Sequence, residues 1–373
     1  MLLDILVIVC VVYSFLYLAV TTAVALGSVR IGGSEEPDEL PRVSVVVCAR
    51  NEEAAIGECM ESLAAQDYPQ DRLEIICVDD ESEDGTREIL DGIEEKYPFV
   101  KILSTENVPR DIPGKQRPLS YGIDHATGEF VCVTDADCTH SRGWIKAHIA
   151  AYNDKVGMAG SITTVGRMYK GLFARLQASE LSSKLAVAMG AAGLGRPVTL
   201  MGNNLSFRKE AYDAFGGLKK IKPHIVEDMA MMNAIVERTD YKIGWVGHPD
   251  GVVSTKPETT FNDLLNQRQR WITELTRLSI NGKVLMTVEI LMATTFFVSL
   301  FLIPWNPAPA IISGMIWLSG YIFILSAAPG ARFMDYLMIP GFILFQLTYS
   351  IPLGYRMLLG NKTVVWKGRV YHK

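Results

Sequence analysis

Short apolar runs and amphipathic segments alternate in the first part of the chain. The runs are rich in Val, Ile and Leu, which is typical of buried strands, and the segments between them carry apolar residues at helical spacing. The expected strands are residues 43–48, 73–78, 99–103 and 129–134, and the expected helices are residues 52–65, 86–96 and 116–126. Repeated strand–helix units of this length predict an α/β fold with a mostly parallel sheet and right-handed crossovers.

The pattern becomes more mixed between residues 156 and 255. Helices are expected near residues 171–190 and 228–237, and a strand over residues 241–246. We therefore assign residues 43–257 to one α/β domain. A polar, glycine- and acid-containing segment, residues 31–42, precedes it as a linker.

Long apolar stretches flank this domain. Residues 3–27 form a stretch interrupted only by Asp4, which exceeds the roughly 20 residues needed to cross a bilayer. Because the start of the chain is not basic, residues 1–30 are expected to be a retained anchor and not a cleaved signal peptide. Three further stretches of near-spanning length, at about 284–303, 309–328 and 333–353, make residues 284–356 a membrane region. Glu289 and Asp335 are expected near segment ends, where a carboxylate is less unfavourable than at the midplane.

The distribution of basic residues gives two conflicting orientations. Arg30 follows the first stretch, so the positive-inside rule puts the amino terminus outside and the α/β domain in the cytoplasm. Four crossings would then leave the tail, residues 357–373, outside. That tail and its flank are basic without any acid, which favours the cytoplasm; the basic residues are Arg356, Lys362, Lys367, Arg369 and Lys373. One terminal segment would have to be re-entrant or interfacial, and the sequence leaves open which.

Net charge and cysteine content narrow the possible binding partners and the cellular compartment. The net charge of −5 and the lack of a basic aromatic patch give no indication of nucleic-acid binding. The six cysteines include no Cys-x-x-Cys pair and lie mostly in strand-like runs, which predicts buried free thiols. The chain is thus expected to be an integral membrane protein with its α/β domain in a reducing compartment.

Acidic residues follow three of the expected strands. The first strand leads into Ala49-Arg50-Asn51-Glu52, the second into Asp79-Asp80-Glu81, and the fourth into Asp135-Ala136-Asp137. Carboxylates spaced like Asp135 and Asp137 can hold one hard cation, and open α/β sheets bind ligands at this edge. A solvated turn would give the same Asp-x-Asp triplet. The first turn lacks the Gly-x-Gly-x-x-Gly pattern, which argues against a nicotinamide or flavin cofactor.

Two further motifs each have a structural and a chemical interpretation. Glu227 and Asp228 precede a helical run, so they are either helix-capping acids or include a general base. Gln267, Arg270 and Trp271 lie in a run whose apolar residues share one helical face. We expect residues 258–283 to form an amphipathic helix at the membrane surface. Its polar side chains either reach towards water or hold a diphosphate, with Trp271 offered to a sugar ring.

Taken in order, these motifs resemble the family 2 glycosyltransferases of GT-A fold. The matching segments are Ala49-Arg50-Asn51-Glu52, residues 78–86, Gly114-Lys115, Asp135-Ala136-Asp137, Gly202-Asn203-Asn204, Glu227-Asp228 and Gln267-x-x-Arg270-Trp271. The resemblance implies a Rossmann-like GT-A domain and an inverting transferase that uses Mg²⁺ or Mn²⁺. One departure is Glu81, where many members carry Gly or Arg.

The resemblance also implies roles for individual residues. Asp228 would be the catalytic base, and Asp137 the metal ligand. Glu227 and Trp271 would meet the acceptor. The residues implied in nucleotide-sugar binding are Ala49, Asn51, Glu52, Asp79, Asp80, Lys115, Asp135, Gln267 and Arg270.

Within that family, the leading span, the expected interfacial helix and the tail motif at 366–371 look most like the ceramide glucosyltransferase and carotenoid or hopanoid glycosyltransferase branch. That branch implies transfer of one sugar from a nucleotide-sugar, expected to be a UDP-sugar, to a membrane lipid at the cytoplasmic face. Two alternatives stay open: a processive polysaccharide synthase of hyaluronan or cellulose type, and a non-catalytic membrane-anchored binding protein with the same fold.

Overall fold

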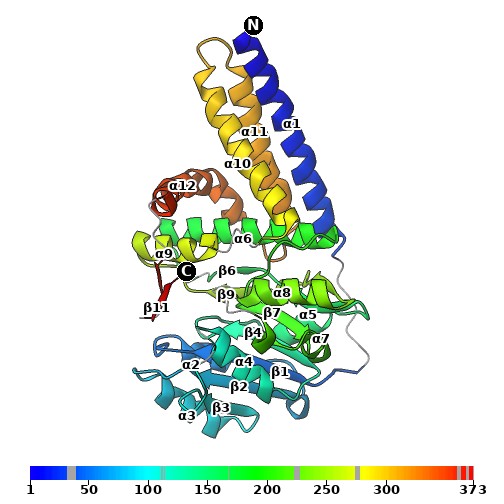
Figure 1. Ribbon diagram of the computed structural model, residues 1–373, viewed down its shortest axis with the longest axis vertical. Coiled ribbons are helices and arrows are strands. Elements are labelled where there is room, and N and C mark those ends of the chain that lie inside the picture. The colour runs from blue at the N-terminus through cyan, green and yellow to red at the C-terminus, as the bar shows by residue number, and fades with distance from the viewer. Residues whose placement is uncertain are drawn as a thin grey trace.

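A computed structural model describes most of the chain in three tiers (Figure 1). The described residues are 1–31, 39–110, 112, 114–166, 168–221, 227–273, 278–358, 363–366 and 369–372, without the side chains of 272–273, 357–358 and the last two segments. Most of the expected linker and much of the basic tail therefore lie outside the described residues. The upper tier is a bundle of long helices, the middle tier holds helices lying across its base, and the lower tier is the α/β domain.

The sheet of the α/β domain is mixed but mostly parallel. Its strand order is β3-β2-β1-β4-β7-β5-β8, and β7 is antiparallel to both of its neighbours. The bounds are β1 Val43–Ala49, β2 Leu73–Asp79, β3 Val100–Ser104, β4 Phe130–Asp135, β5 Val156–Gly160, β7 Asn204–Arg208 and β8 Lys242–Trp245. The α/β class and the predicted strands are confirmed.

Alternating side chains of β1 enter two separate cores. Val46 belongs to a cluster beneath α4, α6 and α8, whereas Val45 and Val47 belong to a cluster beneath α2, α3 and α5. This follows from the two-residue period of a strand covered on both faces. The helices of the domain are α2 Ile56–Ala64, α3 Thr86–Lys96, α4 Gln116–His125, α5 Trp144–Ile149, α7 Lys209–Ala214 and α8 Glu227–Arg238, with 3₁₀ turns at Gln70–Arg72, Leu218–Lys220 and Pro249–Gly251.

The antiparallel strand β7 is the main element that the hydrophobic pattern does not predict. It begins at Asn204, whose amide donates to the Ile162 and Gly251 carbonyls at 2.8 and 2.9 Å. Its Oδ1 accepts from the Trp144 indole at 3.0 Å, and the His148 ring lies 2.9 Å away. A polar residue satisfied in this way can start a buried strand, and the apolar periodicity alone gives no sign of it. A small two-stranded sheet, β6 Thr163–Val165 with β9 Val253–Thr255, lies next to the middle tier.

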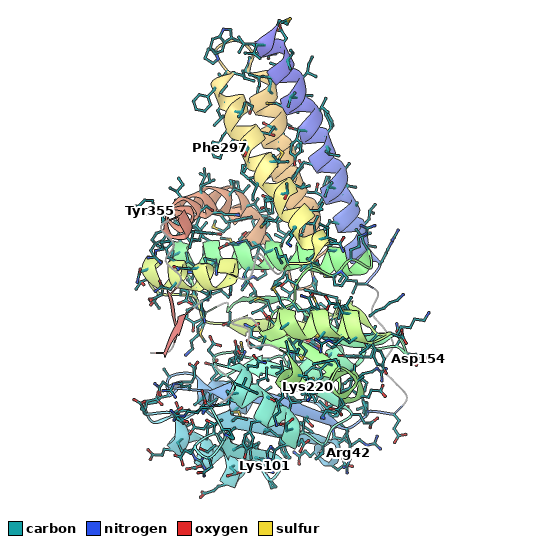
Figure 2. All side chains as sticks on the ribbon, in the orientation of Figure 1. Arg42, Lys101, Asp154, Lys220, Phe297 and Tyr355 are labelled. Carbon is teal, nitrogen blue, oxygen red and sulfur yellow. The ribbon has the colours of Figure 1, made fainter. Side chains whose placement is uncertain are left out.

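Among the described residues, four helices are long and apolar enough to cross a membrane. They are α1 Leu2–Val29, α10 Ile280–Phe301, α11 Ala308–Ser326 and α12 Phe333–Leu358. The first three form the upright bundle in Figure 1, and α12 lies at its base. In Figure 2, Phe297 accordingly sits well above Tyr355, while charged Lys101 and Asp154 lie on the α/β domain.

Glu289 is not near a segment end, contrary to the sequence-based expectation. It lies in the interior of α10, where three donors from two neighbouring helices reach its carboxylate: the Tyr17 hydroxyl at 3.0 Å, the Trp317 indole at 3.0 Å and the Tyr321 hydroxyl at 2.7 Å. A carboxylate in a membrane helix is tolerated when its oxygens are satisfied within the bundle. Asp335 is in the first turn of α12, as expected near an end, and pairs with Arg332 at 3.1 Å.

Two helices of the middle tier connect the bundle to the domain. Helix α6, Leu172–Gly193, crosses the base of α1 so closely that a Cβ on Gly27 would lie 2.2 Å from the Gly190 carbonyl oxygen. Helix α9, Phe261–Thr273, carries the Gln-x-x-Arg-Trp motif. Residues 280–283, expected at the end of the same helix, form the first turn of α10, because the Ser279 hydroxyl caps that turn by accepting from the Gly282 amide at 3.2 Å. Residues 274–277 of the expected helix lie outside the described residues.

Candidate active site

The loops after β1 and β2 are cross-tied at the carboxyl edge of the sheet. The Asn51 side-chain oxygen accepts from the Glu83 amide at 2.8 Å, and the Glu52 amide donates to the Thr86 hydroxyl at 2.8 Å. The Asp79 carboxylate ends β2 and accepts from the Ser82 amide at 3.1 Å. These bonds make the two expected nucleotide-binding loops one unit.

Asp80 forms a buried ion pair inside this unit. The Arg117 guanidinium lies 2.5 Å from its carboxylate, and both side chains are 4% exposed. The Thr105 hydroxyl donates to the same oxygen at 2.7 Å. The carboxylate of Asp80 therefore stabilises the loop. The sequence-based expectation was that this carboxylate contacts the nucleotide.

The backbone conformation and ion pairs of Glu81 account for its departure from the family pattern. Its backbone has a φ of 59°, in the left-handed region that glycine adopts most easily. The side chain is held by Arg110 at 2.8 Å and Arg117 at 3.0 Å. These ion pairs support a strained backbone position that a glycine would occupy without them.

Lys115 connects two carboxylates expected in different roles. Its ammonium contacts the Asp135 carboxylate directly and lies 3.4 Å from that of Glu227. Burial disfavours the charged lysine, but Asp135 and Glu227 outweigh it and hold the pKa of Lys115 well above its usual value. The ammonium is thus a fixed positive charge at the sheet edge.

Asp137 lies beside Asp135 on the loop after β4. Its Oδ2 accepts from the Thr255 hydroxyl of β9 at 3.1 Å. Behind the loop, His140 lies between the Thr134 and Ser62 hydroxyls at 2.8 and 3.0 Å, and its burial lowers the pKa of its ring to about 3. A neutral imidazole supports the loop without adding charge to it.

The donor set fits a cation that is shared with a substrate. Among the described residues, no group of three or more His, Cys, Asp or Glu side chains could hold a metal ion by itself. Asp135 and Asp137 together supply carboxylate oxygens on one loop. Mg²⁺ and Mn²⁺ are commonly held by one or two carboxylates and completed by substrate phosphates, and these residues match that arrangement.

Asp228 is nearly buried at the start of α8. Its Oδ1 accepts from the Met229 amide at 2.6 Å. Burial and the neighbouring charge of Glu227 raise the pKa of Asp228 to about 7. Gly202 packs against it, because a Cβ there would lie 3.0 Å from Asp228 Oδ2. A carboxylate whose pKa is near neutrality suits a general base better than a simple helix cap.

Glu258 connects the sheet edge to α9, although it belongs to none of the sequence motifs. Its carboxylate accepts from the Gln267 side-chain amide at 2.7 Å. Burial is the main cause of its raised pKa; Asp137 raises this pKa further and Arg270 lowers it, which places both of these residues near Glu258. Gln177 of α6 pairs with the backbone of residue 258, accepting at 2.9 Å and donating at 3.0 Å.

Arg268 is the second site residue that the sequence does not reveal. It was one of the unspecified positions of the motif, yet it is buried and lies 2.9 Å from Glu180 of α6. Its guanidinium also donates to the Gln267 side-chain oxygen and lies 4.2 Å from the centre of the Trp271 ring. Arg268 thus contacts two of the three motif side chains. A charged residue at a predicted helix surface gave no signal of burial, because its partner is 88 positions away.

The structure brings most of the expected site residues into one region. Contacts link Asp135, Lys115 and Glu227 directly, and Asp228 is next to Glu227. Electrostatic coupling through Glu258 places Asp137 and Arg270 nearby. Ala49, Asn51 and Asp79 line the adjoining loops, whereas Asp80 points into its ion pair with Arg117.

Comparison with known proteins identifies the family and the fold. The model for "Glycosyl transferase family 2" matches residues 44–215, and the model for "Glycosyl transferase family group 2" matches residues 130–353. The mannosyltransferase PcManGT from Pyrobaculum calidifontis, solved with GDP-Man and Mn²⁺, has a TM-score of 0.59 at 20% identity over 95% of this chain and 99% of that chain. That likeness shows a shared fold.

Two curated relatives match this chain over only part of their own length. The probable glycosyltransferase YdaM of Bacillus subtilis (strain 168) is 42% identical over 105 residues, 28% of this chain and 25% of the relative. The beta-monoglucosyldiacylglycerol synthase of Synechocystis sp. (strain ATCC 27184 / PCC 6803 / Kazusa) is 28% identical over 276 residues, 69% of this chain and 55% of the relative. The chain thus spans from about a quarter to about half of these relatives.

Proposed function

The chain belongs to the family 2 glycosyltransferases, and on this premise we propose that it transfers one sugar from a nucleotide-sugar to a membrane lipid with inversion at the anomeric carbon. The relative named beta-monoglucosyldiacylglycerol synthase supports a lipid acceptor, and a UDP-sugar is our proposed donor. The α/β domain would work at the cytoplasmic face.

One observation carries the proposal. The acidic sheet edge, with Lys115, Asp135 and Asp228, adjoins helix α9, which packs on the apolar helix α12. Leu264 and Leu265 of α9 are buried against Phe345 and Tyr349 of α12. A nucleotide-sugar at the sheet edge would therefore lie next to apolar helices from which a lipid headgroup could approach.

The nucleotide would bind along the ends of the first strands. Our proposed contacts are Ala49, Asn51, Glu52 and Asp79, whereas Asp80 keeps its ion pair with Arg117. Lys115 and Asp135 would hold the ribose and diphosphate side. Gln267 and Arg270 would add donors to diphosphate oxygens, since charge-assisted bonds from a guanidinium are strong.

A divalent cation would be held by Asp137, with Asp135 beside it. When bound, Mg²⁺ or Mn²⁺ would neutralise diphosphate charge as the nucleotide leaves. In this structure the Thr255 hydroxyl donates to the Asp137 carboxylate, and neutral His140 supports the loop that carries it.

Asp228 would take the proton from the attacking acceptor hydroxyl. Its buried position beside Glu227 keeps its proton affinity near that needed at neutral pH. Attack on the face opposite the leaving nucleotide gives inversion in one displacement. Glu227 would lie close to the acceptor, and the Trp271 ring would offer it an apolar face.

The test is transfer in proteoliposomes with UDP- and GDP-sugars, lipid acceptors and Mg²⁺ or Mn²⁺. We expect a single glycolipid product with inverted configuration, and no product with Asp137→Ala, which should stay folded because Asp137 is only half-buried. Asp154→Asn, an exposed acid on the same domain, is the matched control. Full turnover in excess chelator would contradict metal dependence. Retained configuration would contradict the single displacement, and a long polymer would favour the processive alternative.

A further inference from the structure

Helix α12 stays in contact with the middle tier from its first turn to its last. The Ser179 hydroxyl of α6 donates to the Asp335 carbonyl at 2.9 Å. Further along, the Phe345 ring meets that of Phe173 of α6 at 5.7 Å. At the far end, Arg356 donates to Asn266 of α9 at 3.1 Å.

These contacts fix the direction of the helix. Asp335 and Arg356 are separated by roughly 32 Å along an α-helix, at about 1.5 Å per residue. A helix that rose beside the bundle would leave the middle tier within a few turns and could not touch it at both ends. Figure 1 agrees, since α12 does not rise along α1, α10 and α11.

The outer face of α12 carries an apolar stripe. The exposed large apolar residues of this helix are Phe333, Leu337, Leu344, Ile351 and Tyr355. At about 100° per residue these positions fall within roughly 40° of one another. The buried residues Ile339, Phe342, Phe345, Tyr349 and Leu353 fall on the opposite face. The helix therefore has two apolar faces, of which the protein covers one.

We propose that α12 does not cross the membrane but lies in its plane, with this stripe immersed in the lipid leaflet on the side of the α/β domain. We choose the bilayer as the partner of this stripe because the stripe continues the apolar outer surface of the helix bundle. The Tyr321 ring near the end of α11 packs on the Phe342 ring at 4.9 Å, so α12 packs against the end of a membrane helix. An in-plane helix buries its apolar face at the boundary of headgroups and acyl chains.

This placement resolves the conflict over orientation. With α1, α10 and α11 as the only crossings among the described helices, the chain passes the bilayer an odd number of times. The tail after α12 then lies on the same side as the α/β domain. Both basic regions, at Arg30 and in the tail, are on the cytoplasmic side, as the positive-inside rule requires.

The experiment measures the depth of single spin labels in proteoliposomes. Cysteines are introduced at Phe333, Leu337 and Leu344 of α12, and at Ile311, Met315 and Ile322 of α11 as a matched set. Both sets are exposed and share the same spacing along their helices. The unsubstituted chain gives the background, since its cysteines are buried except for half-buried Cys48. A reporter after residue 373 gives the side of the tail.

We expect the α11 labels to differ in depth by roughly 16 Å, the rise of an upright helix over that spacing. The α12 labels should share one depth, be accessible to lipid-dissolved oxygen, and accompany a reporter on the side of the α/β domain. A depth that changes along α12 as it does along α11, or a reporter on the opposite side, would overturn the proposal. Labels shielded from lipid oxygen and broadened by a second copy would also overturn it, because the stripe would then be a contact between chains.

Discussion

The Arg117–Asp80 pair at the sheet edge and the Arg268–Glu180 pair beneath the bundle are both buried, yet they are integrated into the fold in different ways. The loop at Asp80 is also fixed by its backbone, since the Asp80 amide donates to the Ala49 carbonyl at 2.8 Å and Arg50 donates to the Asp80 carbonyl at 2.6 Å. Arg268 connects α9 to α6 through side chains. Backbone bonds therefore fix the proposed nucleotide half of the site, whereas side-chain charge fixes the motif helix.

The largest expected effect is on Asp228, the proposed base at the sheet edge. Asp228→Asn should lower the rate of transfer by about 10²–10⁴-fold while donor binding is kept, because the amide cannot accept the acceptor proton. Single-turnover transfer and calorimetric donor binding would measure the two quantities. Comparable loss of donor affinity would mean that Asp228 holds the donor and would move it out of the base role.

The next effect distinguishes the two buried pairs. Glu180→Gln leaves the Arg268 charge uncompensated and should lower the free energy of unfolding by about 3–5 kcal/mol. Asp80→Asn should cost a similar amount, but only Glu180→Gln should displace Gln267 and Trp271 and so lower lipid transfer in the protein that remains folded. Thermal unfolding in detergent and the KM for lipid acceptor would be measured for both variants. An equal rise of the acceptor KM in the two would erase the proposed difference.

A double variant sharpens this comparison. Replacing both partners, as in Glu180→Gln with Arg268→Met, removes the uncompensated charge and should recover part of the lost stability. The acceptor KM should stay high, because Arg268 no longer contacts Gln267 and Trp271. Recovery of acceptor KM together with stability would show that the pair acts on folding alone.

The pH dependence should involve only the sheet edge. Asp228 accepts a proton only when it is ionised, and its pKa is raised to about 7. The rate should therefore fall by roughly tenfold for each pH unit below that value. Lys184 and Arg268 outweigh the burial of Glu180 and lower its pKa to about 2, so the α9 half should keep its ion pair over the same range. Rate profiles from pH 5 to 8, recorded beside acceptor KM, would test this; a KM that follows the same titration would contradict it.

The smallest effect concerns the aromatic end of the motif. Trp271→Ala removes the ring next to the Arg268 guanidinium, a contact of about 0.5–2 kcal/mol, and should weaken lipid transfer by up to roughly 30-fold. Affinity for the free nucleotide should change little. Arg270→Ala should lower both, because its guanidinium would contact diphosphate oxygens. Equal loss of nucleotide affinity in the two variants would refute this division of roles.

The two halves also differ in how far the sequence predicts them. The loops after β1, β2 and β4 follow strands with clear apolar runs, so the positions of Asp79 and Asp135 could be predicted from local pattern and sheet geometry. Glu258 and Arg268 could not, because their partners come from α6 and distant loops. The antiparallel β7 and the in-plane course proposed for α12 depend on tertiary packing in the same way. Helix length and apolar content predict that α12 could span, but they carry no information about what lies beneath it.

The close crossing of α1 and α6 has a consequence for biosynthesis. Gly27 and Gly190 touch backbone to backbone, and Tyr17 reaches a carboxylate 272 positions further along the chain. At about 5–20 residues per second, a ribosome needs on the order of tens of seconds to make the partners of α1 after α1 itself. The first helix must therefore wait in the bilayer with its glycine face and its tyrosine unmatched. Its early stability has to come from hydrophobicity alone, and the α/β domain can fold before the bundle closes.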